Sequence, residues 1–283
     1  MTLRGTRDRV GFQRKARRIL LTGLKRQVAY LNEQFIPEVL SVSPSYVRDT
    51  DPTIDPVLKA MEQAFTDIAE VMSRQMDELH RTQAVDHTEQ WIAQVKAGIG
   101  IDIGVLIDTT LDGELRLWSQ NTASLIKGAT DDLARGVSRE TINALRLGQS
   151  QAQLAKTLQL QYSEELHGRH VGRTAESRAR AIARKRLAAQ RQVVGGSGMP
   201  AKYWSRYEII ARDQVTSLRS HLDSVRQQEA GIEKYKWKDV DDVRVRPEHA
   251  ARDRNVYDWT HNHSDGHPGE PILCRCIALA VIE

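Results

Sequence analysis

The chain has 283 residues, of which 5% are aromatic and 28% are charged, and its 41 Lys and Arg against 37 Asp and Glu leave a net charge of +4. This composition suits long exposed helices better than sheets, and so small a positive excess does not by itself indicate a nucleic-acid partner. Two cysteines one residue apart exclude the disulfide framework of a small secreted protein. No stretch approaches the roughly 20 apolar residues of a membrane helix, so we expect no membrane partner.

We expect a mainly α fold of long helices with a small α+β portion near the C-terminal end, containing a few short strands and a loop-rich terminus. Composition shifts divide the chain into five regions. They are a basic arm, helix and linker over 1–54, a helical region over 55–110, a second helical region over 111–194, a Gly-rich hinge over 195–202, and a helix with short strands and loops over 203–283.

The first region begins with a basic arm that runs into an amphipathic helix, which we expect to end near Pro37. Between residues 4 and 26, nine basic residues stand against one acid, Asp8. Such a stripe either contacts nucleic-acid phosphates or an acidic protein surface, or it forms a solvated helix face. The candidate phosphate contacts here are Arg14, Lys15, Arg17 and Arg18.

Two helices are expected in the second region. The first starts at residues 55–56, where Asp is the expected N-cap and Pro occupies the first turn, and its Met-rich stripe is interpreted as packing surface. The second stops at residues 98–100, which contain two glycines. In the third region apolar residues recur at helical spacing over 115–137, and we expect Gly136 to interrupt that helix and Ser138 to cap another.

A second basic cluster lies over residues 173–191. On a helix its arginines fall near one line, where they could follow duplex phosphates with salt-sensitive affinity. No helix-turn-helix, zinc-finger or aromatic RNA-binding signature accompanies the stripe, so contact with DNA stays a hypothesis. The arginines of this stripe are Arg173, Arg180, Arg184 and Arg191.

Both cysteines lie in the terminal segment, which follows an expected helix over 203–229 and an expected short strand over 232–237. Cysteine and histidine are ligand types that Zn²⁺ uses, although the Cys-x-Cys spacing fits no standard zinc finger. The alternative is that each cysteine packs as a small apolar residue beside a hydrogen-bonded histidine. No nucleophile or nuclease spacing is visible, and no catalytic residue is assigned. The candidate zinc ligands are His249, His267, Cys274 and Cys276.

Charge pairing offers a structural interpretation of the same segment. Asp242 paired with Arg244 or Arg246 would form a hydrogen-bonded corner that pins the terminal loop to a small sheet. The residues assigned to this structural motif are Tyr235, Trp237, Asp242, Arg244, Arg246, His249, Cys274, Arg275 and Cys276.

These motif residues, together with Trp118-Ser-Gln-Asn121, Gly148-Gln-Ser150 and Ile182-Ala-Arg184, resemble the pattern of phage Mu F-like head morphogenesis proteins, the minor capsid proteins of tailed phages. The resemblance covers about residues 111–281, which would form one head morphogenesis domain, and does not reach residues 1–110. Some relatives carry Cys-x-x-Cys where this chain has Arg246 and His249, so the two cysteines of that pattern are replaced here. Others have a glycine turn that Asn255 is expected to replace, since Asn tolerates a left-handed conformation.

The resemblance implies a non-enzymatic structural protein of the virion head, near the portal vertex and assembled in the host cytoplasm. Its implied partners are portal protein, capsid or scaffolding proteins and double-stranded DNA, with several copies per particle and a role in assembly, packaging or ejection. It implies no cofactor, with zinc left open by the ligand set above. Two alternatives remain, a metal-dependent DNA-acting enzyme or toxin-like module and an architectural duplex-DNA-binding protein.

Overall fold

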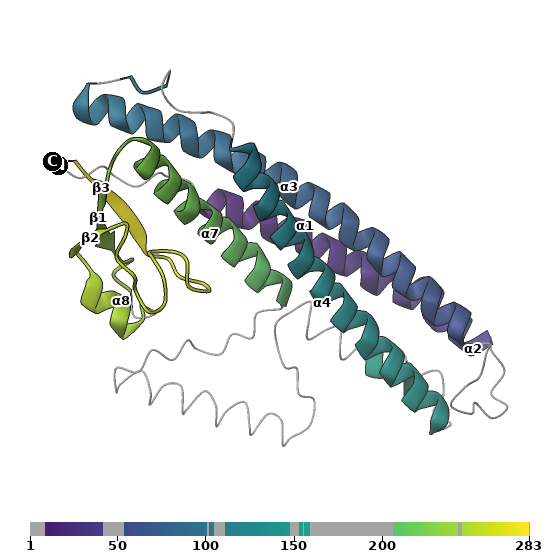
Figure 1. Ribbon diagram of the computed structural model, residues 1–283. Coiled ribbons are helices and arrows are strands. Elements are labelled where there is room, and N and C mark those ends of the chain that lie inside the picture. Colours follow the sequence, from purple (N-terminus) through teal and green to yellow (C-terminus); the bar gives the residue numbers. More distant parts are fainter. Residues whose placement is uncertain are drawn as a thin grey trace.

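The computed structural model describes residues 9–41, 54–100, 102–104, 111–147, 153–154, 156–158, 206–242 and 245–282. Figure 1 shows long helices that run beside one another, with a small sheet near the end where helix α7 finishes. The expected mainly α fold with a few short C-terminal strands is confirmed. The second basic cluster, the Gly-rich hinge and Arg244 lie outside the described residues. No helix among the described residues is long and apolar enough to cross a membrane.

The sequence predicts that the first helix ends near Pro37, but the helical segment continues past this residue. Helix α1 (Arg9–Tyr30) passes through a π-helical turn (Leu31–Phe35) into helix α2 (Ile36–Ser41), which contains Pro37. In the π turn the Ile36 N–H donates to the carbonyl of Leu31, five residues earlier. This shift of the hydrogen-bond ladder places Pro37 in the first turn of the next helical segment, where a missing N–H is tolerated.

The two helices expected over residues 55–100 form one. Helix α3 (Asp55–Ile99) has 45 residues and a buried stripe that includes Met61, Met72 and Met76, which confirms the packing interpretation of the methionines. Its N-cap is Ile54 rather than Asp55, without a side-chain cap. The expected glycine stop is confirmed at Gly100, which has φ 76° and donates its N–H to the Lys96 carbonyl.

Helix α4 (Asp112–Arg146) runs through Gly136 and Ser138, where the sequence predicts a break. Glycine costs about 1 kcal/mol in a helix interior, and burial of several apolar side chains outweighs that. Val137, beside the glycine, is fully buried in the main core. Helix α7 (Arg206–Glu229) is followed by Gly231 at φ 71°, which matches the expected C-terminal glycine.

The main core lies between helices α1, α3, α4 and α7. Helix α1 approaches α3 closely at Gly23, where an added Cβ would come within 2.0 Å of the Met72 sulfur. A side chain at that position would therefore displace the Met72 side chain or the helices themselves. Fully buried members of this core include Leu20, Leu24, Phe65, Ile126 and Val215.

The sheet has three antiparallel strands in the order β2-β1-β3, formed by β1 (Lys234–Lys238), β2 (Val256–Asp258) and β3 (Ile277–Val281). Short helix α8 (Pro247–Arg252) lies between β1 and β2 in the chain. Side chains alternate along β1, so Tyr235 and Trp237 are fully buried on one face. On the adjoining β3, Ala280 belongs to the same apolar cluster as Trp91 of α3. We call residues 232–282 the terminal module.

Candidate functional site

Five of the motif residues meet inside the terminal module. Tyr235 and Trp237 come from β1, His249 from α8, and Cys274 and Cys276 from the segment that leads into β3. All five are at most 3% exposed. The sequence motif therefore marks the interior of this module, where its members contact one another.

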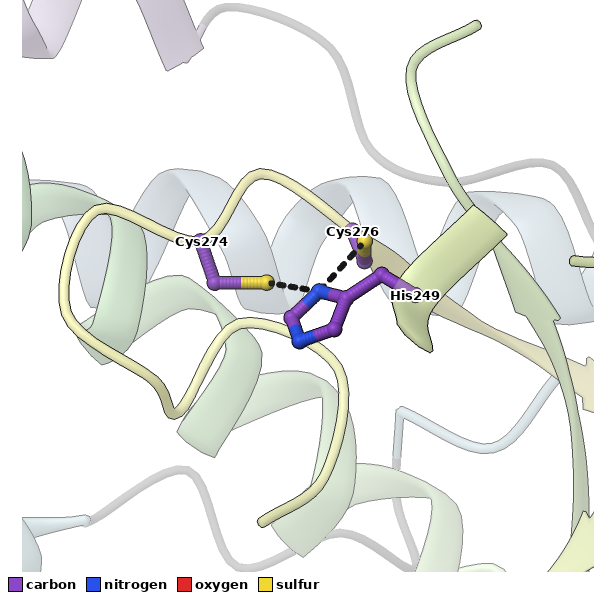
Figure 2. A group of neighbouring side chains, drawn as sticks. All are labelled: His249, Cys274 and Cys276. Atoms are coloured by element: carbon purple, nitrogen blue, oxygen red, sulfur yellow. Dashed lines mark hydrogen bonds between the residues drawn. The ribbon is translucent and has the colours of Figure 1, made fainter. Parts of the chain in front are cut away.

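His249 lies between the two cysteines. Its Nδ1 atom is 3.5 Å from Cys274 Sγ and 3.4 Å from Cys276 Sγ. Figure 2 shows both contacts converging on this one ring nitrogen. Neither cysteine forms a disulfide. The three residues offer one donor atom each within 4.8 Å of one another, which is a spacing that can hold a metal ion.

The contact between the two thiols shifts their pKa values in opposite directions. A hydrogen bond from Cys276 lowers the pKa of Cys274 to about 5. The same bond, together with burial, raises the pKa of Cys276. The backbone N–H of Gly269 donates to Cys274 Sγ over 3.4 Å, which stabilises negative charge on that sulfur.

A chain of polar contacts fixes the ring of His249. Its Nε2 atom is 2.8 Å from an oxygen of Asp265, whose other oxygen accepts from Arg252 Nη1 at 2.6 Å. The Arg252 guanidinium lies 5.0 Å from the centroid of the Trp237 ring, and that ring meets His249 edge to face at 5.3 Å. The carboxylate and the indole together set the direction in which Nδ1 points.

His267 occupies a different place from the one its assignment as a zinc ligand requires. Its Nδ1 atom is 2.9 Å from the Tyr235 hydroxyl, which also lies 3.0 Å from Nε2 of His263. Burial, followed by the nearby Arg252 charge, lowers the pKa of His263 to about 4, so this ring is neutral at pH 7. Burial also raises the pKa of Tyr235, which stays a neutral phenol. The structure groups His267 with Tyr235 rather than with the cysteines.

The expected charged corner exists with another partner. Both oxygens of Asp242 accept from Arg275, at 2.5 and 2.6 Å. Arg275 lies between the two buried cysteines, so its side chain points the other way and reaches Asp242 in the segment after β1. Arg246 donates instead to the carbonyl of Ile272 at 2.8 Å.

The segment that carries the cysteines is attached to helix α7. Asp213 accepts from the Leu273 N–H at 2.7 Å, and Ser217 donates to the Gly269 carbonyl at 3.2 Å. Burial raises the pKa of Asp213. Gly269 has φ 89°, and a Cβ there would lie 1.7 Å from Ser220 Oγ. Only glycine fits this contact without displacement.

Asn255 does not take the left-handed turn position expected of it. The positive φ, 66°, belongs to the preceding residue, Arg254. The N–H of Arg254 donates to the Trp237 carbonyl at 2.8 Å, and Trp237 N–H donates to the Asn255 carbonyl at 2.9 Å. This pair of bonds to β1 fixes the conformation one residue earlier than the sequence predicts.

The basic candidates on α1 are exposed. Arg14, Lys15, Arg17 and Arg18 all face solvent. Arg17 is paired with Glu208 of α7, with Nε and Oε1 2.6 Å apart. The other basic candidates, Arg173, Arg180, Arg184 and Arg191, are outside the described residues.

Sequence reasoning missed two residues of the site. Asp265 is one of two acids in the loop between β2 and β3, and no spacing signal distinguishes it from the other. Asp213 lies on an ordinary helix, so its bond to the terminal loop depends on tertiary packing. The Pro268-Gly269 pair, by contrast, is a visible turn signal in the sequence, and its glycine makes the close contact with Ser220.

The chain is thus a mainly helical protein whose long packed helices are joined to a small module with a buried, internally bonded interior. Residues 135–279, just over half of the chain, match the family model described as Phage Mu protein F like protein. The chain belongs to this family of phage head morphogenesis proteins.

One similar protein, from Haemophilus influenzae, is described as an uncharacterized protein. It is 32% identical over 145 residues, which make up 51% of this chain and 30% of the relative. The chain thus spans less than a third of that protein's length. No solved structure matches the chain.

Proposed function

We propose that this protein is a minor structural component of a phage head, located near the portal vertex, where it contacts portal protein and packaged DNA. Membership of the phage Mu protein F-like family supports the head role. The observation that carries DNA contact is the exposed basic face of α1. The same helix buries its opposite face in the main core, so its basic side chains are held on a rigid element.

The basic face of α1 is continuous and carries no acid. Arg14, Arg18 and Lys25 lie within one side of the helix at spacings of four and seven residues, and all are exposed. Lys15 and Arg26 flank them, also exposed. From residue 14 to residue 26 this face extends about 18 Å along the helix axis. No Asp or Glu occurs between Arg9 and Tyr30.

The neighbouring helix has the opposite character. Helix α3 carries twice as many acidic as basic residues. Positive charge on the helical body is therefore concentrated on α1, and its chemistry matches an anionic partner such as a phosphate backbone. Arg17 is set apart from this face by its ion pair with Glu208.

The test of DNA contact is a triple variant, Arg14→Gln, Arg18→Gln and Lys25→Gln. Each neutralised phosphate contributes about 0.9 to the slope of log affinity against log salt, so the slope for duplex DNA should fall by about 2 to 3. The matched control replaces Lys59, Arg74 and Arg116, three exposed basic residues of α3 and α4, by Gln. An unchanged slope in the α1 variant would reject this face as the contact.

The test of the portal contact is co-sedimentation of the purified full chain with portal oligomers of the same phage. We expect the chain to enter the portal fraction, and the α1 triple variant to do so equally. Failure of the wild-type chain to co-sediment at assembly concentrations would overturn the portal proposal. Salt-dependent DNA binding without portal binding would instead favour an architectural DNA-binding protein.

A further inference from the structure

The cluster of His249, Cys274 and Cys276 holds three donor atoms within 4.8 Å of one another. We propose that it binds one Zn²⁺ ion through Nδ1 of the histidine and Sγ of both cysteines. The three side chains come from α8 and from the segment before β3, 25 and 27 residues further along the chain. They are 2–3% exposed, so the ligands are shielded from water and from competing anions.

The spacing of the donor atoms fits the geometry of zinc. An ion with Zn–N near 2.05 Å and Zn–S near 2.3 Å, at tetrahedral angles, holds nitrogen and sulfur about 3.6 Å apart. In the structure these separations are 3.5 and 3.4 Å. The two sulfurs lie within 4.8 Å of each other, so one ion can contact all three atoms after small side-chain shifts.

The arrangement of His249 is that of a metal ligand with an outer carboxylate. Asp265 accepts a hydrogen bond from Nε2 at 2.8 Å, which leaves the lone pair of Nδ1 directed at the two sulfurs. Metal-binding histidines commonly donate their second ring N–H to a carboxylate in this way. Since this lone pair faces two sulfur atoms, a cation that contacts all three atoms satisfies them better than a proton from one thiol.

The ligand types select the metal. Two thiolates and one imidazole favour Zn²⁺ over the oxygen-preferring Mg²⁺ and Ca²⁺. On binding, each thiol that is still protonated releases its proton to solvent, and the histidine binds in its neutral form. The residues that the structure describes supply three donors to this cluster. His267 is not among the donors that lie within 4.8 Å of one another, and its Nδ1 contacts the Tyr235 hydroxyl instead.

The ion would connect helix α8 to the segment before β3, which lies 25 to 27 residues further along the chain. Helix α8 would be tied to the start of β3, and through Gly269 and Leu273 to helix α7. Metal binding at a site formed only in the folded state stabilises that state. The proposed role is therefore structural, and it does not depend on the proposed contacts with portal or DNA.

The first test is elemental analysis of the full-length protein purified without chelators. We expect about one zinc per chain in the wild type. His249→Gln, Cys274→Ser and Cys276→Ser should each reduce the content at least tenfold. The controls are His267→Gln and His261→Gln, which should retain zinc at the wild-type level. Zinc well below one per chain in the wild type would overturn the proposal, as would equal loss in the His267 variant.

The second test distinguishes lost ligation from lost folding. Cobalt(II) is exchanged into the wild-type protein, and thiolate-to-cobalt charge-transfer absorption is measured. The expected intensity is that of two thiolates, and an absorption spectrum without thiolate ligation would overturn the assignment. The circular dichroism of each variant is recorded as well, since retained helicity together with lost zinc assigns the loss to the ligand.

Discussion

His87 of α3 and Asp223 of α7 lie 2.8 Å apart, Nε2 to Oδ1, with side chains only 3% and 7% exposed. Thr88, the next residue, accepts from Arg226 Nη2 of α7 at 3.1 Å. These contacts place buried polar groups inside the contact between the two helices. Polar groups so buried fix the register of the helices, because sliding one past the other would leave the groups unbonded.

We predict that Asp223→Ala destabilises the protein by about 2 to 4 kcal/mol, because His87 would stay buried without its partner. Denaturant unfolding followed by helical circular dichroism measures the change. Asp131→Ala is the control, since its carboxylate pairs with Lys127 at the surface, and it should cost less than about 1 kcal/mol. Equal losses in the two variants would contradict the role given to the buried pair.

Gly269→Ala should loosen the terminal module from α7. The substitution combines a left-handed backbone, φ 89°, with a collision against Ser220, and strain of this kind costs about 1 to 3 kcal/mol before the collision is counted. Amide hydrogen exchange should increase in β3 and in the segment preceding it. Gly113→Ala, on α4 with no atom within 4 Å of the added Cβ, should be neutral or stabilising by up to about 1 kcal/mol. Unchanged exchange in the Gly269 variant would refute this view of the contact.

His80 is expected to make stability fall in mild acid. It is fully buried, and within the described part of the chain neither ring nitrogen has a hydrogen-bond partner. Burial lowers its pKa from 6.5 to about 4, against the opposing influence of Asp77. Between pH 6.5 and 4, His80 is protonated in the unfolded chain but stays neutral in the folded chain. Stability is therefore lost between pH 6.5 and 4, by about 3 kcal/mol in total.

The measurement is the free energy of unfolding at several pH values for wild type and His80→Gln. The difference between the two curves should change in that window and be flat above pH 7. His261→Gln, at an exposed position, serves as the control and should parallel the wild type. Parallel curves for the His80 variant would show that this histidine is not the group responsible.

Arg275→Lys should weaken the closure of the terminal module without unfolding it. Arginine contacts both oxygens of Asp242, whereas lysine presents a single charge and cannot form the paired geometry. Both side chains are partly exposed, so the expected cost is at most about 1 kcal/mol. Asp242→Asn should give a similar loss, and the double variant should cost no more than either single change. Additive losses would show that the two residues act separately.

Periodicity of apolar residues predicted the buried faces of the long helices, because side-chain direction along a helix is fixed by its geometry. It did not predict that α4 would continue through Gly136 or that the first helix would pass Pro37. A local preference of about 1 kcal/mol is outweighed when neighbouring side chains such as Val137 are fully buried. At Pro37 the outcome depends on a π turn that no simple spacing signals.

The candidate site was predictable in its residue types and less so in its pairings. Cys274, Cys276 and His249 were named together from the sequence, and the structure places them in contact. To predict the position of His267 and the partner of Asp242, one must know which loop residues point inward. That direction is set by the turn at Gly269 and by α7, which are tertiary features absent from the local sequence pattern.

Helix α7 belongs to both parts of the molecule. Tyr207 and Val215 lie in the main core, while Asp213 and Ser217 bond to the segment that carries the cysteines. Gln227, near its end, donates to the Ala278 carbonyl of β3 at 2.9 Å. Helix α3 adds a second connection, since Trp91 packs in one cluster with Ala280 of β3. The helical body and the terminal module should therefore unfold together, in one cooperative calorimetric transition.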